Sequence, residues 1–158
     1  MSGHPIAYAI GRDDLTSDDV LDLLRLHLEE MHRWSPACKV HAMPPERLRA
    51  PDVTFFAVRE GKTLAAVGAL KDLGEARGEL KSMRAAPDYR GKGAGEVLLV
   101  HLLAEAKARG YNWLGLETGR PEPFAPAKRL YAKHGFAECP AFGDYVSDEF
   151  SLCMEKHL

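Results

Sequence analysis

The sequence is poor in cysteine, in net charge and in long apolar runs. Its three cysteines, Cys38, Cys139 and Cys153, are odd in number and form no Cys-x-x-Cys pair, so no disulfide framework, zinc site or redox couple is indicated. A formal net charge of −2 gives no electrostatic attraction toward nucleic acid or an anionic membrane. Neither a membrane span nor a secretory signal is present in the sequence pattern. We therefore expect a cytoplasmic protein that uses no metal and binds neither nucleic acid nor membrane.

What the sequence does contain is typical of an ordinary globular α/β protein. Its 158 residues are 46% apolar and 28% charged, which favours a single domain over residues 1–158. Apolar residues recur at helical spacing between Asp18 and Trp34. Prolines then interrupt residues 35–52, apart from one short helix predicted at 45–50.

The rest of the chain alternates between strand and helix patterns. A turn at Gly61-Lys62 joins the first two predicted strands, and a second turn is predicted at 72–78. Strands are predicted at 54–60, 63–70, 79–85, 112–118 and 150–156, and helices over 98–106 and 126–134. This order predicts a mixed α/β sheet with helices on its faces.

A glycine-rich loop precedes the helix at 98–106. Gly91, Gly93 and Gly95 let the backbone approach a ligand closely, and a helix that begins there turns unpaired N–H groups toward an anion. Arg90 and Lys92 add two positive charges, which suits a pyrophosphate. The sequence therefore predicts an anion-binding helix start, with a simple flexible turn as the alternative.

Two nucleotide-binding alternatives fit this loop less well. The segment lacks the spacing and the hydroxyl residue of an NTPase P-loop. A dinucleotide fold would place an acid near Glu117, about twenty residues beyond the glycines. However, the spacing is Gly-x-Gly-x-Gly, and the preceding strand alternates polar with apolar residues, unlike a buried parallel strand.

The run Met83-Arg84-Ala85-Ala86-Pro87-Asp88-Tyr89-Arg90-Gly91-Lys92-Gly93-Ala94-Gly95 resembles the acetyl-CoA-binding signature of the GCN5-related N-acetyltransferase (GNAT) superfamily. A second run, Ala127 to Phe136, is similar to that family's other signature. Residues 31–43 and 116–119 are similar to a subgroup of small bacterial acetyltransferases. The resemblance implies a mostly antiparallel sheet with a splayed parallel strand pair, between 79–85 and 112–118.

The resemblance also implies roles for individual residues. Backbone groups of Met83 and Ala85 would pair with the pantetheine arm of acetyl-CoA, and Tyr131 would protonate the leaving thiolate. Phe124 stands where many members of the family carry asparagine, so one polar contact is missing. The pyrophosphate would be held by the loop Arg90, Gly91, Lys92, Gly93, Ala94 and Gly95.

Acetyl transfer to an amine needs a neutral nucleophile. An alkylamine with a pKa of about 10.4 is almost wholly protonated at neutral pH, so a base or a water chain is expected. Glu79 and Glu117 are the best-placed carboxylates, with a solvent-facing or ion-paired carboxylate as the alternative for each. Direct transfer is simpler than an acetyl-enzyme on Cys139.

The acceptor is expected to be a small-molecule, amino-acid or peptide amine. Ser35 and His41 lie in or beside the irregular segment that, by the resemblance, would line its pocket, with exposed loop residues as the alternative. His27 lies on the apolar stripe of the first helix, where a buried structural imidazole is the alternative to a role in binding. Homodimers are common in the family, and these residues argue neither for nor against one. Two rival functions remain, a non-catalytic acyl-CoA-binding module and a nucleotide-binding oxidoreductase.

Overall fold

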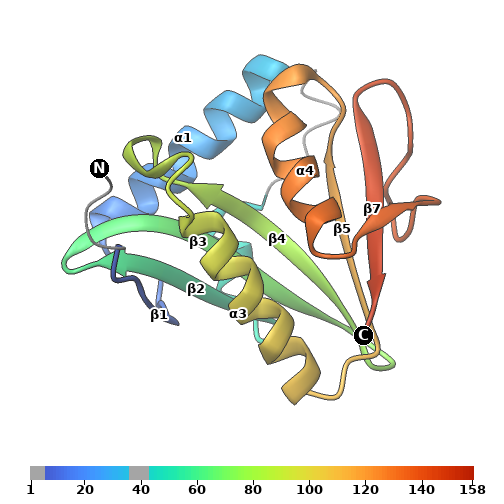
Figure 1. The fold of residues 1–158 in the computed structure, drawn as a ribbon, viewed down its shortest axis with the longest axis horizontal. Coiled ribbons are helices and arrows are strands. Elements are labelled where there is room, and N and C mark those ends of the chain that lie inside the picture. The colour runs from blue at the N-terminus through green and yellow to red at the C-terminus, as the bar shows by residue number, and fades with distance from the viewer. Residues whose placement is uncertain (1–5, 36–42) are drawn as a thin grey trace.

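The chain folds around one seven-stranded sheet, seen in a computed structural model that describes residues 6–35 and 43–158. The strands lie in the order β1-β2-β3-β4-β5-β7-β6 (Figure 1). The strands are β1 (Ala9–Arg12), β2 (Val53–Glu60), β3 (Thr63–Gly74), β4 (Arg77–Ala85), β5 (Trp113–Gly119), β6 (Ala137–Cys139) and β7 (Ser151–His157). The helices are α1 (Asp18–Trp34), α2 (Pro45–Leu48), α3 (Ala94–Ala108) and α4 (Ala125–Lys133), with short 3₁₀ turns η2 (Pro87–Tyr89) and η3 (Glu122–Phe124).

One pair of strands in this sheet is parallel, and it comes apart after three residues. Every other pair is antiparallel. Strand β4 pairs with β5 only over residues 77–79, opposite 113–115. Beyond Glu79 the two strands diverge, as the green and orange strands of Figure 1 show. The predicted mixed sheet with a splayed parallel pair is therefore confirmed.

The turn expected at 72–78 is present but shorter than predicted. Strand β3 continues to Gly74, and β4 begins at Arg77. These two residues pair with each other, so the turn consists of Glu75 and Ala76. Both residues have positive φ angles, 56° and 61°, the conformation of the tight hairpin turns that match strand twist. Neither is glycine or asparagine, so the sequence predicted a turn here but not its two-residue length.

Side chains of alternate residues in the sheet pack against helices on opposite faces. On β2, Phe56 and Val58 belong to the core cluster under α3, while Phe55 and Ala57 belong to the cluster under α1 and α2. This alternation is the expected result of a strand's two-residue period. Among the described residues, no helix is both long and apolar enough to cross a membrane.

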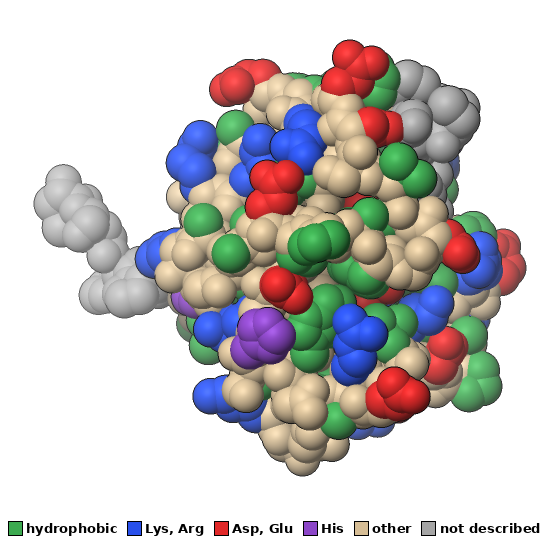
Figure 2. All heavy atoms as spheres, turned by 90° about the vertical axis from the view of Figure 1, so that its right-hand side faces the viewer, with side chains coloured by type: hydrophobic (Ala, Val, Ile, Leu, Met, Phe, Trp, Pro, Cys, Tyr) green, Lys and Arg blue, Asp and Glu red, His purple; other side chains and the backbone are tan. Residues whose placement is uncertain are grey.

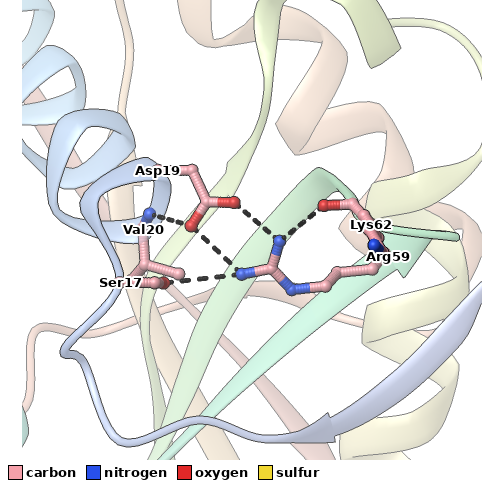
Figure 3. A network of polar contacts seen from close by, with 5 residues as sticks. All are labelled: Ser17, Asp19, Val20, Arg59 and Lys62. Carbon is pink, nitrogen blue, oxygen red and sulfur yellow. Dashed lines mark hydrogen bonds and ion pairs between the residues drawn. The ribbon is translucent and has the colours of Figure 1, made fainter.

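The start of α1 is tied to β2 by a polar network (Figure 3). Arg59 donates to both carboxylate oxygens of Asp19, at 2.6 and 3.1 Å. Asp19 also accepts from the backbone N–H of Val20, at 2.7 Å. Hydrogen bonding by Arg59, above other causes, holds the pKa of the Asp19 carboxyl well below its usual range. The network fixes the position of α1 beside the sheet, and α1 forms one wall of the cavity described next.

Candidate active site

The divergence of β4 and β5 opens a cavity of about 1000 Å³. Residues 79–85 of β4 and 116–118 of β5 line it, together with side chains from α1, the glycine-rich loop, η3 and α4. The cavity therefore lies where the sheet splits, and it is reached by both predicted signature segments.

A β-bulge in β4 lies shortly beyond Glu79, where pairing with β5 ends. Ala69 pairs with Lys81 and Val67 pairs with Arg84, so two residues of β4, Ser82 and Met83, lie opposite one residue of β3. Ser82 has φ +53°, in the left-handed region that favours glycine. Bulges increase local twist and bend the strand that carries them. Here the bend turns β4 out of the plane it shares with β5.

The free edge of β4 faces the cavity. Beyond Glu79 it has no pairing with β5, while its other edge stays paired with β3 as far as Ala85. Met83 and Ala85 both line the cavity. An unpaired strand edge presents backbone N–H and C=O groups that an extended chain can pair with. This edge is therefore suited to a narrow, amide-containing ligand.

The glycine-rich loop forms the anion-binding end of the cavity. Gly91 and Gly93 have φ +74° and +84°, and α3 begins at Ala94 with no side-chain cap. The first amides of a helix have no partner within it and attract an anion. Four of the predicted loop residues line the cavity, namely Arg90, Gly91, Gly93 and Gly95.

Lys92 and Ala94, also predicted as cofactor-binding, do not line the cavity with their side chains. The Lys92 ammonium lies 5.8 Å from the centre of the Tyr89 ring, and its carbonyl accepts from the Tyr8 hydroxyl at 2.8 Å. Ala94 is fully buried in the core. Any contact that these two residues make with an anion is therefore expected through their backbone.

Glu79 lies at the base of the split, with 4% of its surface exposed. Its carboxylate accepts a hydrogen bond from the Tyr145 hydroxyl and pairs with the Lys81 ammonium at 3.3 Å. Lys81 Nζ and Tyr145 Oη are 2.5 Å apart, which closes a three-membered polar cluster. Glu79 is therefore buried and paired with Lys81 rather than facing solvent.

Glu117 faces the same side of the sheet as Glu79. Glu79 pairs with Gly115, and Glu117 lies two residues further along β5. Its carboxylate accepts from the Ser151 hydroxyl at 2.5 Å. Burial, then the charge of Glu79 and more weakly that of Glu117, raises the pKa of Tyr145 well above its ordinary value. The Tyr145 hydroxyl therefore stays protonated beside both carboxylates.

Tyr145 is a site residue that the sequence did not reveal. It lies in the irregular segment before β7 and lines the cavity. No motif or periodicity surrounds it, so only the folded chain shows its contact with Glu79.

Tyr131 on α4 also lines the cavity and is buried. Burial raises the pKa of its hydroxyl well above the ordinary value, so the group is protonated at neutral pH. Its ring packs edge-on against Phe136, with ring centres 5.7 Å apart. Phe124, at the start of the same helix, lines the cavity and contacts Trp34 edge-on at 5.4 Å.

The residues predicted for the acceptor pocket have different placements. His27 is buried, lines the cavity and has no hydrogen-bond partner for Nδ1 within the described part of the chain. Burial, then the charge of Arg84, lowers its pKa to about 4. Ser35 is buried and is not among the lining residues, and His41 lies outside the described residues. Met31 and Trp34 line the cavity beside His27, on one face of α1.

No group of three potential metal-ligating side chains is present within residues 6–35 and 43–158.

Comparisons with known proteins agree with this geometry. The family described as "Acetyltransferase (GNAT) family" matches residues 20–136. The chain is 44% identical over 146 residues to the Bacillus subtilis protein named "Uncharacterized N-acetyltransferase YsnE", covering 92% of this chain and 97% of that one. It is also 44% identical to "Uncharacterized N-acetyltransferase YedL" of Escherichia coli, covering 96% and 95%.

Solved structures share the fold. A crystal structure described as an acyl-CoA N-acyltransferase from Klebsiella pneumoniae has a TM-score of 0.76 at 30% identity and covers 96% of this chain and 97% of its own. A Bacillus subtilis acetyltransferase solved in complex with CoA has a TM-score of 0.72 at 18% identity, with 96% and 99% covered. The second likeness concerns the fold alone.

Proposed function

Because the chain belongs to the GNAT family of acetyltransferases, we propose that it transfers the acetyl group of acetyl-CoA directly to an amine within the cavity between β4 and β5. The acceptor is a small molecule, an amino acid or a peptide. Family membership removes the dinucleotide-binding alternative. The cytoplasm, expected from the sequence, is the proposed location.

One observation carries this proposal, namely that a free strand edge and an uncapped helix start line the same cavity. The edge of β4 from Leu80 to Ala85 offers backbone groups to the amides of pantetheine. The start of α3, with Arg90 beside it, offers N–H groups and positive charge to the pyrophosphate. These two features together suit two adjoining parts of acetyl-CoA, the amide-containing pantetheine arm and the pyrophosphate.

The acceptor must lose a proton for the reaction to proceed. Glu79 and Glu117 lie on one face of the sheet at the base of the split, and we assign them to proton removal, directly or through water. The amine nitrogen then attacks the thioester carbonyl, and the bond to sulfur breaks as the new amide bond forms. Tyr131, kept protonated by burial, donates its proton to the departing thiolate.

Acetyl-CoA binding and turnover can be measured separately. We expect acetyl-CoA to raise the unfolding temperature, because a ligand that binds only the folded state stabilises it. We also expect free CoA thiol to appear when a panel of amines is added. Absence of both effects would contradict the proposal. A thermal shift without thiol release across the panel would instead favour the non-catalytic acyl-CoA-binding module.

A further inference from the structure

Arg84 is a buried cation on the wall of the cavity. It follows the β4 bulge, and its guanidinium contacts the Glu30 carboxylate of α1. Its side chain is 11% exposed, and its Cζ lies 5.4 Å from the centre of the Trp34 ring. Neither the proposed proton transfers nor the anion-binding loop uses this residue.

Arg84 shares its carboxylate partner with a second arginine. Glu30 also pairs with Arg90, at 3.0 Å, so one carboxylate serves two guanidinium groups. Residues 1–5 and 36–42, outside the described part, contain no Asp or Glu. No carboxylate side chain from those segments can therefore join Glu30, which Arg84 shares with Arg90 of the anion-binding loop.

The hydrogen-bonding capacity of Arg84 is also incomplete. Its Nε is buried and has no hydrogen-bond partner among the described residues. Burial, then the charge of Arg90, lowers the pKa of Arg84 to about 10, so the group remains charged at neutral pH. A buried donor without a partner is costly, and a charged one more so. A ligand with an anionic oxygen would offset the charge of the guanidinium and accept a hydrogen bond from its Nε.

Arg84 lies on the α1 side of the cavity, away from α3, the helix that follows the glycine-rich loop. Met83, its neighbour in β4, packs on the cluster that contains the α3 residues. Arg84 instead contacts α1, through Glu30 and Trp34. Successive residues of a strand face opposite sides of the sheet, in agreement with these contacts. An anion bound by Arg84 would therefore lie toward α1 rather than α3.

The proposed proton acceptors lie at the base of the split. Glu79 and Glu117 line the cavity there, where the acceptor amine would lose its proton. An amine placed at that end and an acid group at Arg84 would belong to one molecule that carries both.

We propose that the acceptor is an amine with a free carboxylate, an amino acid or short peptide, whose carboxylate is bound by Arg84. A guanidinium suits this role because its planar donors match a carboxylate in two parallel hydrogen bonds. The inference rests on the proposed acetyl transfer and narrows its substrate class.

The test compares amino acids and dipeptides with their own C-terminal amides, by the rate of CoA thiol release. For the wild type and Arg84→Met, the ratio of kcat/KM for acid over amide is determined for each pair. Comparing ratios between the two proteins cancels the different basicity of the two amines. We expect the ratio to fall about 10- to 100-fold in Arg84→Met. Arg84→Lys keeps the positive charge but loses the planar pair of donors. Its ratio should therefore lie between those of the wild type and Arg84→Met.

Arg25→Met is the matched control, because Arg25 is an exposed arginine of α1 outside the cavity, 70% of its side chain being accessible. It should leave the ratio unchanged. Unfolding temperature and the acetyl-CoA thermal shift are measured for each variant, so that a misfolded protein is recognised. If Arg84→Met misfolds, the acid-to-amide ratio of Arg84→Lys tests whether Arg84 binds the carboxylate.

Three results would overturn the inference. An unchanged acid-to-amide ratio in Arg84→Met, with turnover retained, would show that Arg84 does not bind the acceptor's carboxylate. The proposed acetyl transfer would be unaffected by that result. A raised KM for acetyl-CoA with the same unchanged ratio would assign Arg84 to the phosphates of CoA. Absence of both the acetyl-CoA shift and thiol release would instead refute the proposed function, and the inference with it.

Discussion

At the scale of single residues, the placement of Tyr131 fits a proton donor, because it lines the cavity and its hydroxyl is protonated at neutral pH. We expect Tyr131→Phe to lower kcat about 100-fold while the Kd for acetyl-CoA stays the same. Steady-state kinetics and equilibrium binding measure the two quantities. Tyr111→Phe is the control, since Tyr111 is a buried tyrosine that does not line the cavity. An unchanged kcat in Tyr131→Phe would remove this tyrosine from the mechanism.

Tyr145 is expected to act through Glu79, whose carboxylate accepts a hydrogen bond from its hydroxyl. We expect Tyr145→Phe to lower kcat/KM about tenfold, the usual effect of removing a hydrogen bond to a charged group. In a double-mutant cycle, Tyr145→Phe should cost little more once Glu79 is already Gln. Additive losses in the cycle would show that Tyr145 acts independently of Glu79.

His27 makes stability depend on pH. Its pKa is about 4 in the folded chain and about 6.5 when exposed, so the unfolded state binds the proton more tightly. Stability is therefore complete above pH 6.5 and is lost as the pH falls toward 4. Between pH 7 and pH 4.5 we expect the wild type to lose about 2 to 3 kcal/mol more unfolding free energy than His27→Gln.

Urea unfolding at both pH values measures this difference. His32→Gln is the matched control, an exposed histidine on the same helix, and should behave as the wild type. The same pH dependence in His27→Gln as in the wild type would mean that other groups cause the loss.

At the scale of elements, the glycine-rich loop depends on left-handed backbone at Gly93, where φ is +84°. We expect Gly93→Ala to cost about 1 to 2 kcal/mol of stability and to raise the Kd for acetyl-CoA, because the loop amides are displaced. Gly61→Ala is the matched control, with φ +58° in the hairpin between β2 and β3. It should lose similar stability and keep its affinity. Equal affinity in both variants would exclude the loop from binding.

How far the sequence predicted these elements depended on periodicity. The first helix was predicted at Asp18 to Trp34 and lies there, because its apolar stripe is long and regular. β1 and β6 were missed, since they have four and three residues and are mostly exposed, so no alternation marks them. Short edge strands form through pairing with distant segments, which a local pattern does not contain.

The site was predictable where a motif fixes the backbone and not where distant segments meet. The glycines carried the signal for the loop. The bulge at Ser82 was not predictable, because serine rarely adopts a positive φ. This conformation arises from the pairing of β4 with β3. The contacts of Arg84 with Glu30 and of Glu79 with Tyr145 each join residues more than fifty positions apart.

At the scale of the whole molecule, the sheet consists of two parts joined by three residue pairs between β4 and β5. A second connection lies at the start of α3, where Glu96 pairs with Lys133 at 2.7 Å and with His134 at 2.6 Å, both at the end of α4. Figure 2 shows acidic and basic side chains interspersed on the face beyond α4 and β7. The core cluster under α3 also contains residues of both parts, such as Leu80 and Leu116, so apolar packing holds the two parts together as well.

Acetyl-CoA is expected to lie across this junction. In hydrogen–deuterium exchange we expect it to slow exchange at residues 82–85 and 90–96 and to leave β2 unaffected. CoA that lacks the acetyl group should protect the same amides, as the matched control for pantetheine and pyrophosphate. Protection confined to the α3 start would mean that the β4 edge does not pair with the ligand.

The open edge of β4 also has a consequence for the protein's solubility. An unpaired strand edge on a protein surface invites strands of other chains and leads to aggregation. In this fold the split places that edge inside the molecule, with α1 and α4 on the walls around it. The helices that line the ligand cavity therefore also cover this edge, so it is not presented to strands of other chains.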